Sequence, residues 1–290
     1  MQYNVPMNTL ANLNGKIMPL QDVMVPALDR GYLFGDGIYE ALHLVNGKLR
    51  FQPFHMARLQ RSLHELHIQG VNLERLQERL WATIQASGLH NAFVYIQITR
   101  GVGPRRSHAY PDGLTPTELI YVEPFIDPYE EQRSKGIRVI TFPDLRWRRC
   151  DIKSLNLLGN VLAARAAQEK GASEAILEAA DGTWNEASRS SLFGVMHGQV
   201  YTGPNSPAIL PGVTRGFVLQ LIADLGLTMV EKHLRRQDVD QLTELFITGT
   251  TAEVLPIVQV DDRKVGEGIP GPLTRKLQAA FRERLQKEEA

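Results

Sequence analysis

The sequence predicts a two-domain α+β protein, because helical and strand-like segments are mixed without the strict alternation of βαβ units. A doubly wound parallel sheet is therefore not expected. The segment 123–136 holds two prolines, several charges and a glycine, which is typical of a connection. A chain of 290 residues is long enough for two modest domains. We expect an N-terminal α/β domain over residues 1–122 and a C-terminal α+β domain over residues 137–290.

The elements of the first domain follow from hydrophobic periodicity. Asn14 and Asn46 each precede a glycine, which predicts tight β-hairpins among the short strands of residues 1–52. Pro53 then opens a helical pattern that continues to about Ile68. The other predicted elements of this domain are a helix over about 73–86 and strands over 93–99 and 118–122.

The second domain is predicted by the same criteria. Its helices are expected at about 156–170, 213–225 and 272–285. Its strands are expected at about 137–142, 175–178, 192–196, 199–201, 229–233 and 245–248.

Composition excludes several classes of protein. Lys plus Arg and Asp plus Glu both number 32, so no basic surplus is present to bind nucleic acid or an anionic membrane. No apolar run reaches the roughly 18–20 residues of a membrane span, and we expect no secretory signal. The single cysteine, Cys150, excludes an intrachain disulfide. His64 and His67 have helical spacing, but a solvated helix face is favoured over metal binding. We expect no metal and a cytoplasmic location.

The lysines are few enough to compare individually. Of the nine, eight lie in turns, at element ends or in patterns that predict exposure. Lys153 lies among apolar neighbours just before a predicted helix. Burial lowers the pKa of a lysine and makes its amine a nucleophile. A lysine that lays its stem along apolar surface at a helix start fits the position equally well.

Two loops are suited to binding a phosphate. The turn 249–251 follows an apolar strand, and the segment 210–215 begins a predicted helix, where backbone amides attract anions. Arg58, on the first predicted helix, offers a fork of donors to the same kind of group. Each signal is weak alone, since Gly-Thr turns and helix starts are common. Glu186 precedes a hydroxyl-rich stretch, where a glutamate is ordinarily a solvated turn residue.

Together these segments resemble class IV (fold type IV) pyridoxal-phosphate-dependent aminotransferases, and within them the bacterial D-amino acid transaminases. The resemblance runs from about Asp29 to Phe281 with its motifs in the family's order. The motifs that carry it are residues 29–40, 55–59, 146–159, 185–186, 209–215 and 249–253.

The resemblance implies pyridoxal 5'-phosphate bound between the two domains. It implies that Lys153 forms the Schiff base and moves a proton, and that Glu186 pairs with the pyridine nitrogen and keeps it protonated. Tyr39 matches a tyrosine near the cofactor's phenolic oxygen, and Leu210 a leucine packed on its ring. The residues that match the phosphate site are Arg58, Val213, Thr214 and Thr250.

The loop 100–111 bears on the substrate. By resemblance, Arg106 and His108 bind the substrate's α-carboxylate, and Tyr39 and Thr251 also contact the substrate. The loop is one residue longer than the family pattern, so Arg105 shares or displaces the role of Arg106. A solvated basic loop is the structural alternative.

The resemblance thus implies a transaminase that moves an amino group from a D-amino acid, of the D-alanine or D-glutamate type, to a 2-oxo acid by a ping-pong mechanism. The alternatives of the same fold are a branched-chain L-amino acid transaminase, an (R)-selective amine transaminase and an aminodeoxychorismate lyase. A non-enzymatic scaffold would leave Lys153, Glu186 and Tyr39 without a reason to coincide. The resemblance also implies a homodimer, with small-molecule substrates as its other partners.

Overall fold

In the computed structural model, which describes residues 9–289, hairpins form at both Asn-Gly dipeptides. Asn14 joins β1 (Leu10–Leu13) to β2 (Lys16–Pro19), and Asn46 joins β3 (Gly37–Val45) to β4 (Lys48–Leu49). Both asparagines and the glycines after them have positive φ. This backbone matches the twist of the paired strands, so the two turns set the register of both hairpins.

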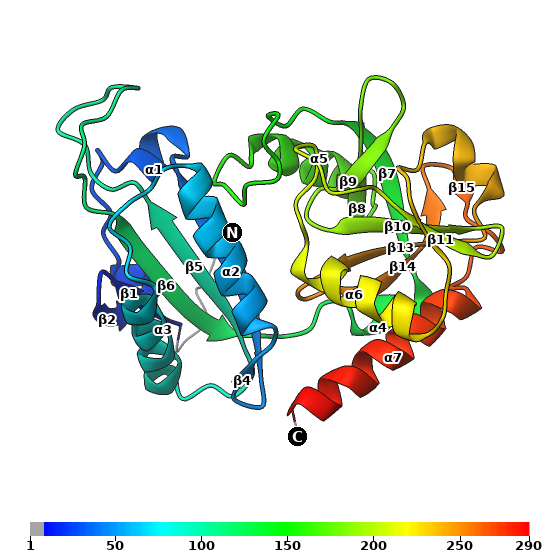
Figure 1. Ribbon diagram of the computed structural model, residues 1–290, viewed down its shortest axis with the longest axis horizontal. Helices are drawn as coiled ribbons and strands as arrows, with labels where there is room; N and C mark the ends of the chain where they lie inside the picture. The colour runs from blue at the N-terminus through cyan, green and yellow to red at the C-terminus, as the bar shows by residue number, and fades with distance from the viewer. Residues whose placement is uncertain (1–8, 290) are drawn as a thin grey trace. The chain divides into compact units, whose positions relative to one another are not determined.

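The first sheet is antiparallel, in the order β2-β1-β6-β5-β3-β4, with β5 (Ala92–Thr99) and β6 (Thr117–Pro124) at its centre. Two helices, α2 (Gln52–Glu65) and α3 (Leu73–Ser87), cover one face of this sheet (Figure 1). Pro53 lies in the first turn of α2, and the Asn72 side chain caps α3 by accepting from the Arg75 amide at 2.9 Å.

The two faces of this sheet differ in character. Along β3, Ile38, Leu42 and Leu44 are fully buried against the helices. The intervening residues face the other way, where Tyr39 stacks on Tyr95 with ring centroids 5.7 Å apart. The period of two along the strands therefore places the core on one face and an aromatic row on the other.

The second sheet is mixed, in the order β12-β11-β10-β13-β14-β7-β8-β9, with β15 paired to β14. Its strands run antiparallel except for the pairs β11–β12, β14–β7 and β7–β8. The strands are β7 (Ile137–Pro143), β8 (Glu174–Glu178), β9 (Trp184–Ala187), β10 (Ser191–Met196), β11 (Gln199–Thr202), β12 (Met229–Glu231), β13 (Glu244–Gly249), β14 (Glu253–Val260) and β15 (Arg263–Lys264).

Helices pack on this second sheet through small and aromatic side chains. Ala163 and Ala167 of α5 (Leu158–Glu169) lie on β7 and β8. Phe217 of α6 (Val213–Asp224) meets Phe281 of α7 (Pro272–Glu289) edge to face at 5.3 Å. The remaining helical turns are α1 (Arg30–Phe34), α4 (Glu130–Lys135), η1 (Leu20–Asp22) and η2 (Arg236–Gln241).

The chain divides into two compact units after Ile126, within the connection expected over residues 123–136. That connection also contains α4. Residues Ile152–Asn156, which the sequence places in the C-terminal domain, belong to the first unit. They do so because this segment pairs with the start of β3.

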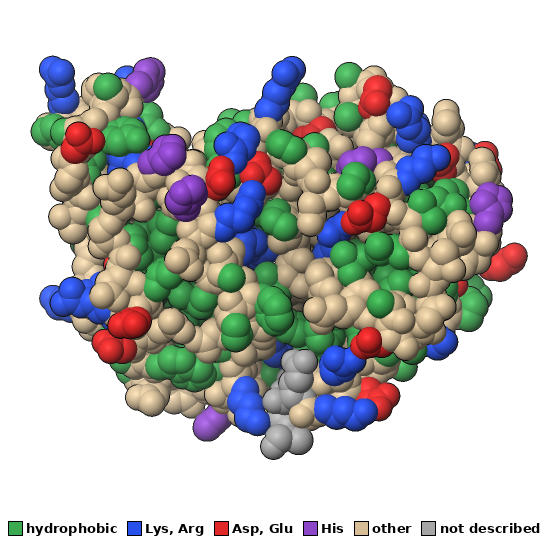
Figure 2. Space-filling model, in the orientation of Figure 1, with side chains coloured by type: hydrophobic (Ala, Val, Ile, Leu, Met, Phe, Trp, Pro, Cys, Tyr) green, Lys and Arg blue, Asp and Glu red, His purple; other side chains and the backbone are tan. Residues whose placement is uncertain are grey.

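The surface agrees with the balanced composition. On the face drawn in Figure 2, basic and acidic side chains are interspersed. Among the described residues, no helix is long and apolar enough to cross a membrane. Nor do the side chains that the structure describes include a group of His, Cys, Asp or Glu placed to bind a metal ion.

Candidate active site

Lys153 is distinct from every other lysine in the structure. All nine lysines fall within residues 9–289, and only Lys153 is half-buried while the other eight are exposed. Its Nζ lies 4.2 Å from the centroid of the Tyr39 ring. The structure therefore brings together two candidate residues that lie 114 positions apart in the sequence.

Backbone pairing explains this placement. The Tyr39 amide donates to the Lys153 carbonyl at 3.0 Å, and the Leu155 amide donates to the Gly37 carbonyl, also at 3.0 Å. The Lys153 amide donates to Ser62 Oγ at 3.3 Å. A Cβ on Gly37 would lie 2.7 Å from the Ile98 carbonyl oxygen, so only glycine allows this close approach.

Arg58 lies in a buried ion pair. Its Nε and Nη2 each donate to a carboxylate oxygen of Glu40 at 2.8 Å, and His55 Nδ1 is 2.7 Å from the same carboxylate. Burial raises the pKa of Glu40, but the charge and hydrogen bonds of Arg58 and His55 lower it to about 2. Burial also lowers the pKa of His55. Glu40 thus fixes the orientation of the Arg58 guanidinium.

In the second unit, Glu186 is a buried carboxylate rather than a solvated turn residue. Arg146 Nη1 donates to its Oε1, and the Leu210 amide donates to both oxygens at 3.1 and 3.3 Å. Burial raises the pKa of Glu186, and Arg146 opposes that shift. Arg146 is itself held by Asp144, through bonds of 2.9 and 2.7 Å. The carboxylate is therefore fixed in position by a cation, an amide and its own backbone.

The two phosphate-loop candidates of the second unit come together. The N-cap of α6 is Gly212, which has no side chain to satisfy the amides of Val213 and Thr214. A Cβ on Gly212 would lie 2.6 Å from Ser191 Oγ, and one on Gly249 would lie 3.3 Å from Ser190 Oγ. Since Ser190 and Ser191 are neighbours, the start of α6 and the turn 249–251 border the same short stretch of chain.

The turn 249–251 is held by an arginine that was not among the candidates predicted from the sequence. Arg133 Nη2 donates to the Thr251 carbonyl at 2.7 Å, and its Nε to the Ala252 carbonyl at 3.1 Å. Asp127 pairs with the same guanidinium. Thr250 and Thr251 remain half-buried at the end of β13.

In the loop after β5, Arg106 and His108 are exposed and flank one aromatic ring. The guanidinium carbon of Arg106 lies 5.4 Å from the Phe34 centroid, and the His108 ring meets Phe34 edge to face at 5.5 Å. Arg105, the preceding residue, lines a cavity together with Arg30 and Ser107. Arg106 and His108 therefore share the Phe34 ring as a common contact.

Several functional candidates carry no sequence signal of their own. Glu40, His55 and Arg146 lie inside motifs that the resemblance used, but their partners are 15, 18 or 40 residues away. Asp144 and Ser190 likewise appear only through contacts. These residues stand out because their polar or charged side chains are sheltered from solvent. That property is seen in the structure and not in the spacing of residues along the sequence.

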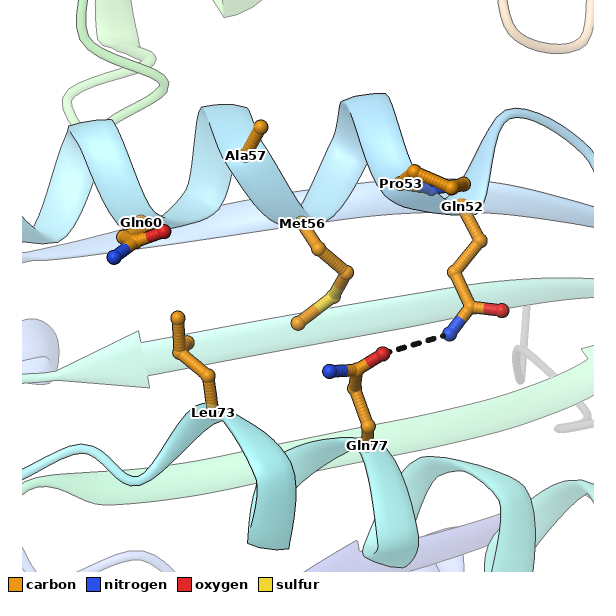
Figure 3. A pocket seen from close by; sticks show the side chains of 7 residues that line it. All are labelled: Gln52, Pro53, Met56, Ala57, Gln60, Leu73 and Gln77. Carbon is orange, nitrogen blue, oxygen red and sulfur yellow. Dashed lines mark hydrogen bonds between the residues drawn. The ribbon is translucent and has the colours of Figure 1, made fainter.

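A groove between α2 and α3 lies away from these groups. It measures about 470 Å³ and is lined by Gln52, Pro53, Met56, Ala57, Gln60, Leu73 and Gln77. Figure 3 shows Gln52 donating to Gln77 across it, at 3.2 Å. No titratable side chain lines the groove, so it offers neither a nucleophile nor an acid.

Comparison with known proteins agrees with the site. The family described as amino-transferase class IV matches residues 37–260. The chain therefore belongs to the class IV aminotransferases, and it is a pyridoxal-phosphate-dependent enzyme. Its two sheets with packed helices are the fold of that class.

Individual proteins similar to this chain include D-alanine aminotransferases. The chain is 40% identical to a D-alanine aminotransferase of Bacillus licheniformis, over 96% of this chain and 97% of that protein. It is 36% identical to a D-alanine aminotransferase of Staphylococcus haemolyticus, over 94% and 97%. A solved branched-chain amino acid aminotransferase of Escherichia coli superposes with a TM-score of 0.88 at 26% identity, covering 94% of this chain and 93% of that one.

Proposed function

We propose that this protein is a D-amino acid:2-oxo acid transaminase. The observation that carries the proposal is the pairing of Arg106 and His108 about Phe34, on an enzyme that is 40% identical to a D-alanine aminotransferase. An arginine fork is suited to a carboxylate, which every amino acid and 2-oxo acid presents. The branched-chain aminotransferase shares the fold at lower identity, so fold alone does not choose the substrate.

The residues fit the cofactor by the chemistry of their donors. A glycine-capped helix start and two threonines suit a phosphate, a buried carboxylate suits a ring nitrogen, and a half-buried amine suits a carbonyl. When bound, pyridoxal phosphate supplies an electron sink for the substrate's α-carbon. Everything else in the reaction falls to the residues of the chain.

We assign Lys153 the central role. Its amine would hold the cofactor, and its Nζ would move the proton at the substrate's Cα. The Tyr39 ring, 4.2 Å from Nζ, limits where that amine can move. The same groups act in both halves of a ping-pong reaction, first with the amino donor and then with the 2-oxo acceptor.

Glu186 is proposed to hold a proton on the pyridine nitrogen. Its contacts with Arg146 and the Leu210 amide keep the carboxylate immobile. Leu210, which donates that amide, is proposed to pack against the ring.

The phosphate is proposed to bind Arg58 together with Val213, Thr214 and Thr250. The support is the glycine-capped start of α6, its proximity to the turn 249–251, and the orientation that Glu40 gives Arg58.

For the substrate, Arg106 and His108 are proposed to bind the α-carboxylate, with Tyr39 and Thr251 as further contacts. Arg105 is proposed as a neighbour of this pair rather than a replacement for it, because it lines a cavity with Arg30 whereas Arg106 and His108 contact the Phe34 ring. The donor panel that tests this compares D-alanine, D-glutamate, L-leucine and an (R)-amine without a carboxylate. We expect D-alanine or D-glutamate to be fastest; preference for L-leucine or the amine would overturn the proposal.

The covalent role of Lys153 has a spectroscopic test. We expect visible absorbance from the loaded enzyme that shifts on adding D-alanine. Lys153→Ala abolishes the shift, whereas Lys170→Ala, at an exposed lysine just after α5, leaves it intact. Full turnover by Lys153→Ala would contradict the assignment.

We also propose a homodimer. Leu158, Val161 and Leu162 lie on one face of α5 with 72, 57 and 46% of their surfaces exposed, which is an apolar patch suited to a second copy. Sedimentation is expected to give twice the chain mass of 32.5 kDa, and Val161→Glu to reduce it. An active monomer would refute this proposal.

A cytoplasmic location is proposed from the single free cysteine. Cys150 is buried and unpaired by any disulfide. Fractionation of the producing cell would test it, and recovery outside the cytoplasm would contradict it.

A further inference from the structure

The loop that presents Arg106 and His108 is fixed by an arginine that the proposed reaction does not use. Arg30 is buried, with 5% of its surface exposed, at the start of α1. Its Nη1 donates to the Ser107 carbonyl at 2.7 Å, and its Nη2 to the His108 carbonyl at 3.0 Å. One guanidinium thus holds the two residues that follow Arg106 in the chain.

Arg30 is in turn held by Asp36, which lies between two arginines. Arg30 Nε donates to Asp36 Oδ2 at 2.7 Å, and Arg100 donates to both carboxylate oxygens at 2.8 and 2.9 Å. Arg100 also donates to the carbonyls of Leu66 and His67 at the end of α2. The network therefore ties the loop to a helix that the hydrophobic core fixes in place.

The base of the loop is fixed separately. The Arg30 amide donates to the Gly101 carbonyl at 2.9 Å. A Cβ on Gly101 would lie 1.9 Å from the Thr115 carbonyl oxygen, so the two ends of the loop are in direct contact there. Only the part beyond this contact depends on the Arg30 side chain.

Aromatic rings complete the support. The Arg30 guanidinium lies 4.9 Å from the Phe34 centroid, and that ring is the one which Arg106 and His108 flank. Tyr110 lies over Arg100 at 3.9 Å. The loop encloses a cavity of about 340 Å³ rather than a packed core, so these contacts replace the apolar packing that would otherwise order it.

We infer that Arg30 is a positioning residue for substrate recognition, because it holds the chain that aims Arg106 and His108 at the substrate carboxylate. The inference rests on the carboxylate-binding role proposed above for those two residues. Loss of the Arg30 side chain frees the loop, so the carboxylate must order it on binding, which weakens binding without altering the chemistry at Lys153.

The test measures KM and kcat for D-alanine and the Kd of the holoenzyme for propionate, a carboxylate that cannot react. For Arg30→Ala we expect KM and Kd to rise about tenfold, or about 1.4 kcal/mol, with kcat nearly unchanged. Arg30→Lys is expected to recover little of this loss, since an ammonium lacks the fork that spans two carbonyls. Arg79→Ala, which removes a half-buried arginine paired with Glu118 in the same unit, serves as the matched control and should leave both constants unchanged.

A double-mutant cycle separates positioning from general damage. If Arg30 acts through Arg106, then Arg30→Ala raises KM and the Kd for propionate little further when Arg106 is already replaced by alanine. Additive effects, or a wild-type Kd for propionate in Arg30→Ala, would overturn the inference. Should Arg30→Ala fail to fold, Phe34→Leu removes the shared ring while retaining the ion pair, and the same cycle with Arg106 applies.

The cycle also distinguishes the positioning role of Arg30 from the carboxylate-binding role of Arg106 and His108. A raised KM in Arg106→Ala with a normal KM in Arg30→Ala refutes only the positioning role. A normal KM in Arg106→Ala refutes the carboxylate assignment and the positioning role with it. No turnover of any D-amino acid by the wild-type enzyme refutes the proposed function itself.

Discussion

Replacing Glu40 by glutamine tests the buried ion pair beneath Arg58. Glu40 is fully buried and receives two hydrogen bonds from Arg58 and one contact from His55. The pKa of Glu40 falls from its ordinary 4.5 to about 2, which corresponds to roughly 3 kcal/mol of stability at neutral pH. Glu40→Gln keeps the shape but removes the carboxylate that pairs with the buried Arg58 charge, and breaking such pairs costs about 3–5 kcal/mol.

The sign of the pH dependence follows from the depressed pKa. A carboxylate whose pKa is lower in the folded state contributes its full stability above the pKa of the unfolded chain, 4.5. That contribution is lost as the pH falls toward 2. At pH 3 it is less than half of its value at pH 7.

The assay is urea unfolding of the holoenzyme at pH 7 and pH 3, followed by circular dichroism. We expect Glu40→Gln to be less stable by roughly 3 kcal/mol at pH 7 and by less than half of that at pH 3. Glu169→Gln is the matched control, because Glu169 pairs with Arg165 on the exposed face of α5, and we expect a change within about 0.5 kcal/mol. Equal stability of Glu40→Gln and wild type at pH 7, or a difference that does not shrink at pH 3, would refute the reasoning.

Three further outcomes are expected. Arg146→Met leaves the Glu186 carboxylate buried without its cation, so its pKa rises further; equilibrium dialysis should show about tenfold weaker cofactor binding, and unchanged affinity would contradict the role of Arg146. Gly37→Ala forces a Cβ against the Ile98 carbonyl and should lower stability by about 1–3 kcal/mol, whereas Gly216→Ala, in a helix with open space around it, should be neutral or stabilising by up to about 1 kcal/mol; calorimetry that reversed this order would refute the close-approach argument. Burial raises the pKa of Cys150 to about 11, so its thiol should react with a maleimide at pH 8 far more slowly than in the urea-unfolded chain, and equal labelling rates would disprove that burial.

Residues identified by type and local context were predictable from the sequence. Lys153 was selected as the one lysine with an apolar setting, and it is the one lysine in residues 9–289 that is not exposed. The sequence context also indicated burial, and here the structure differs in degree: Lys153 is half-buried, with its amine against the Tyr39 ring. The local sequence pattern predicts that a side chain is shielded from solvent. The degree of burial depends on a facing ring from another strand, which the local pattern does not show.

Pairings between distant residues were not predictable. The partner of Glu186 is Arg146, 40 positions earlier, and nothing in the spacing of either residue indicates the other. Strand β14 was missed because Pro256 interrupts its apolar run, although the strand runs through it. Helix α1 was missed because five residues are too few for a periodic pattern.

Buried arginines have a common structural role in the loops around the site. Backbone carbonyls in irregular loops need hydrogen-bond donors when they are buried, since no neighbouring strand or helix supplies them. Buried arginines donate to such carbonyls at Ser107 and His108, Leu66 and His67, Thr251 and Ala252, Ala208, and Gly203. A planar fork can span two carbonyls while a carboxylate neutralises it from the other edge, and an ammonium cannot do both in fixed geometry. Arg30 with Asp36 and Arg133 with Asp127 follow this arrangement, whereas Arg146 donates to the Ala208 carbonyl and to the carboxylates of Asp144 and Glu186. Each such pair leaves the net charge of the chain unchanged and fixes a loop that carries a proposed ligand-binding residue.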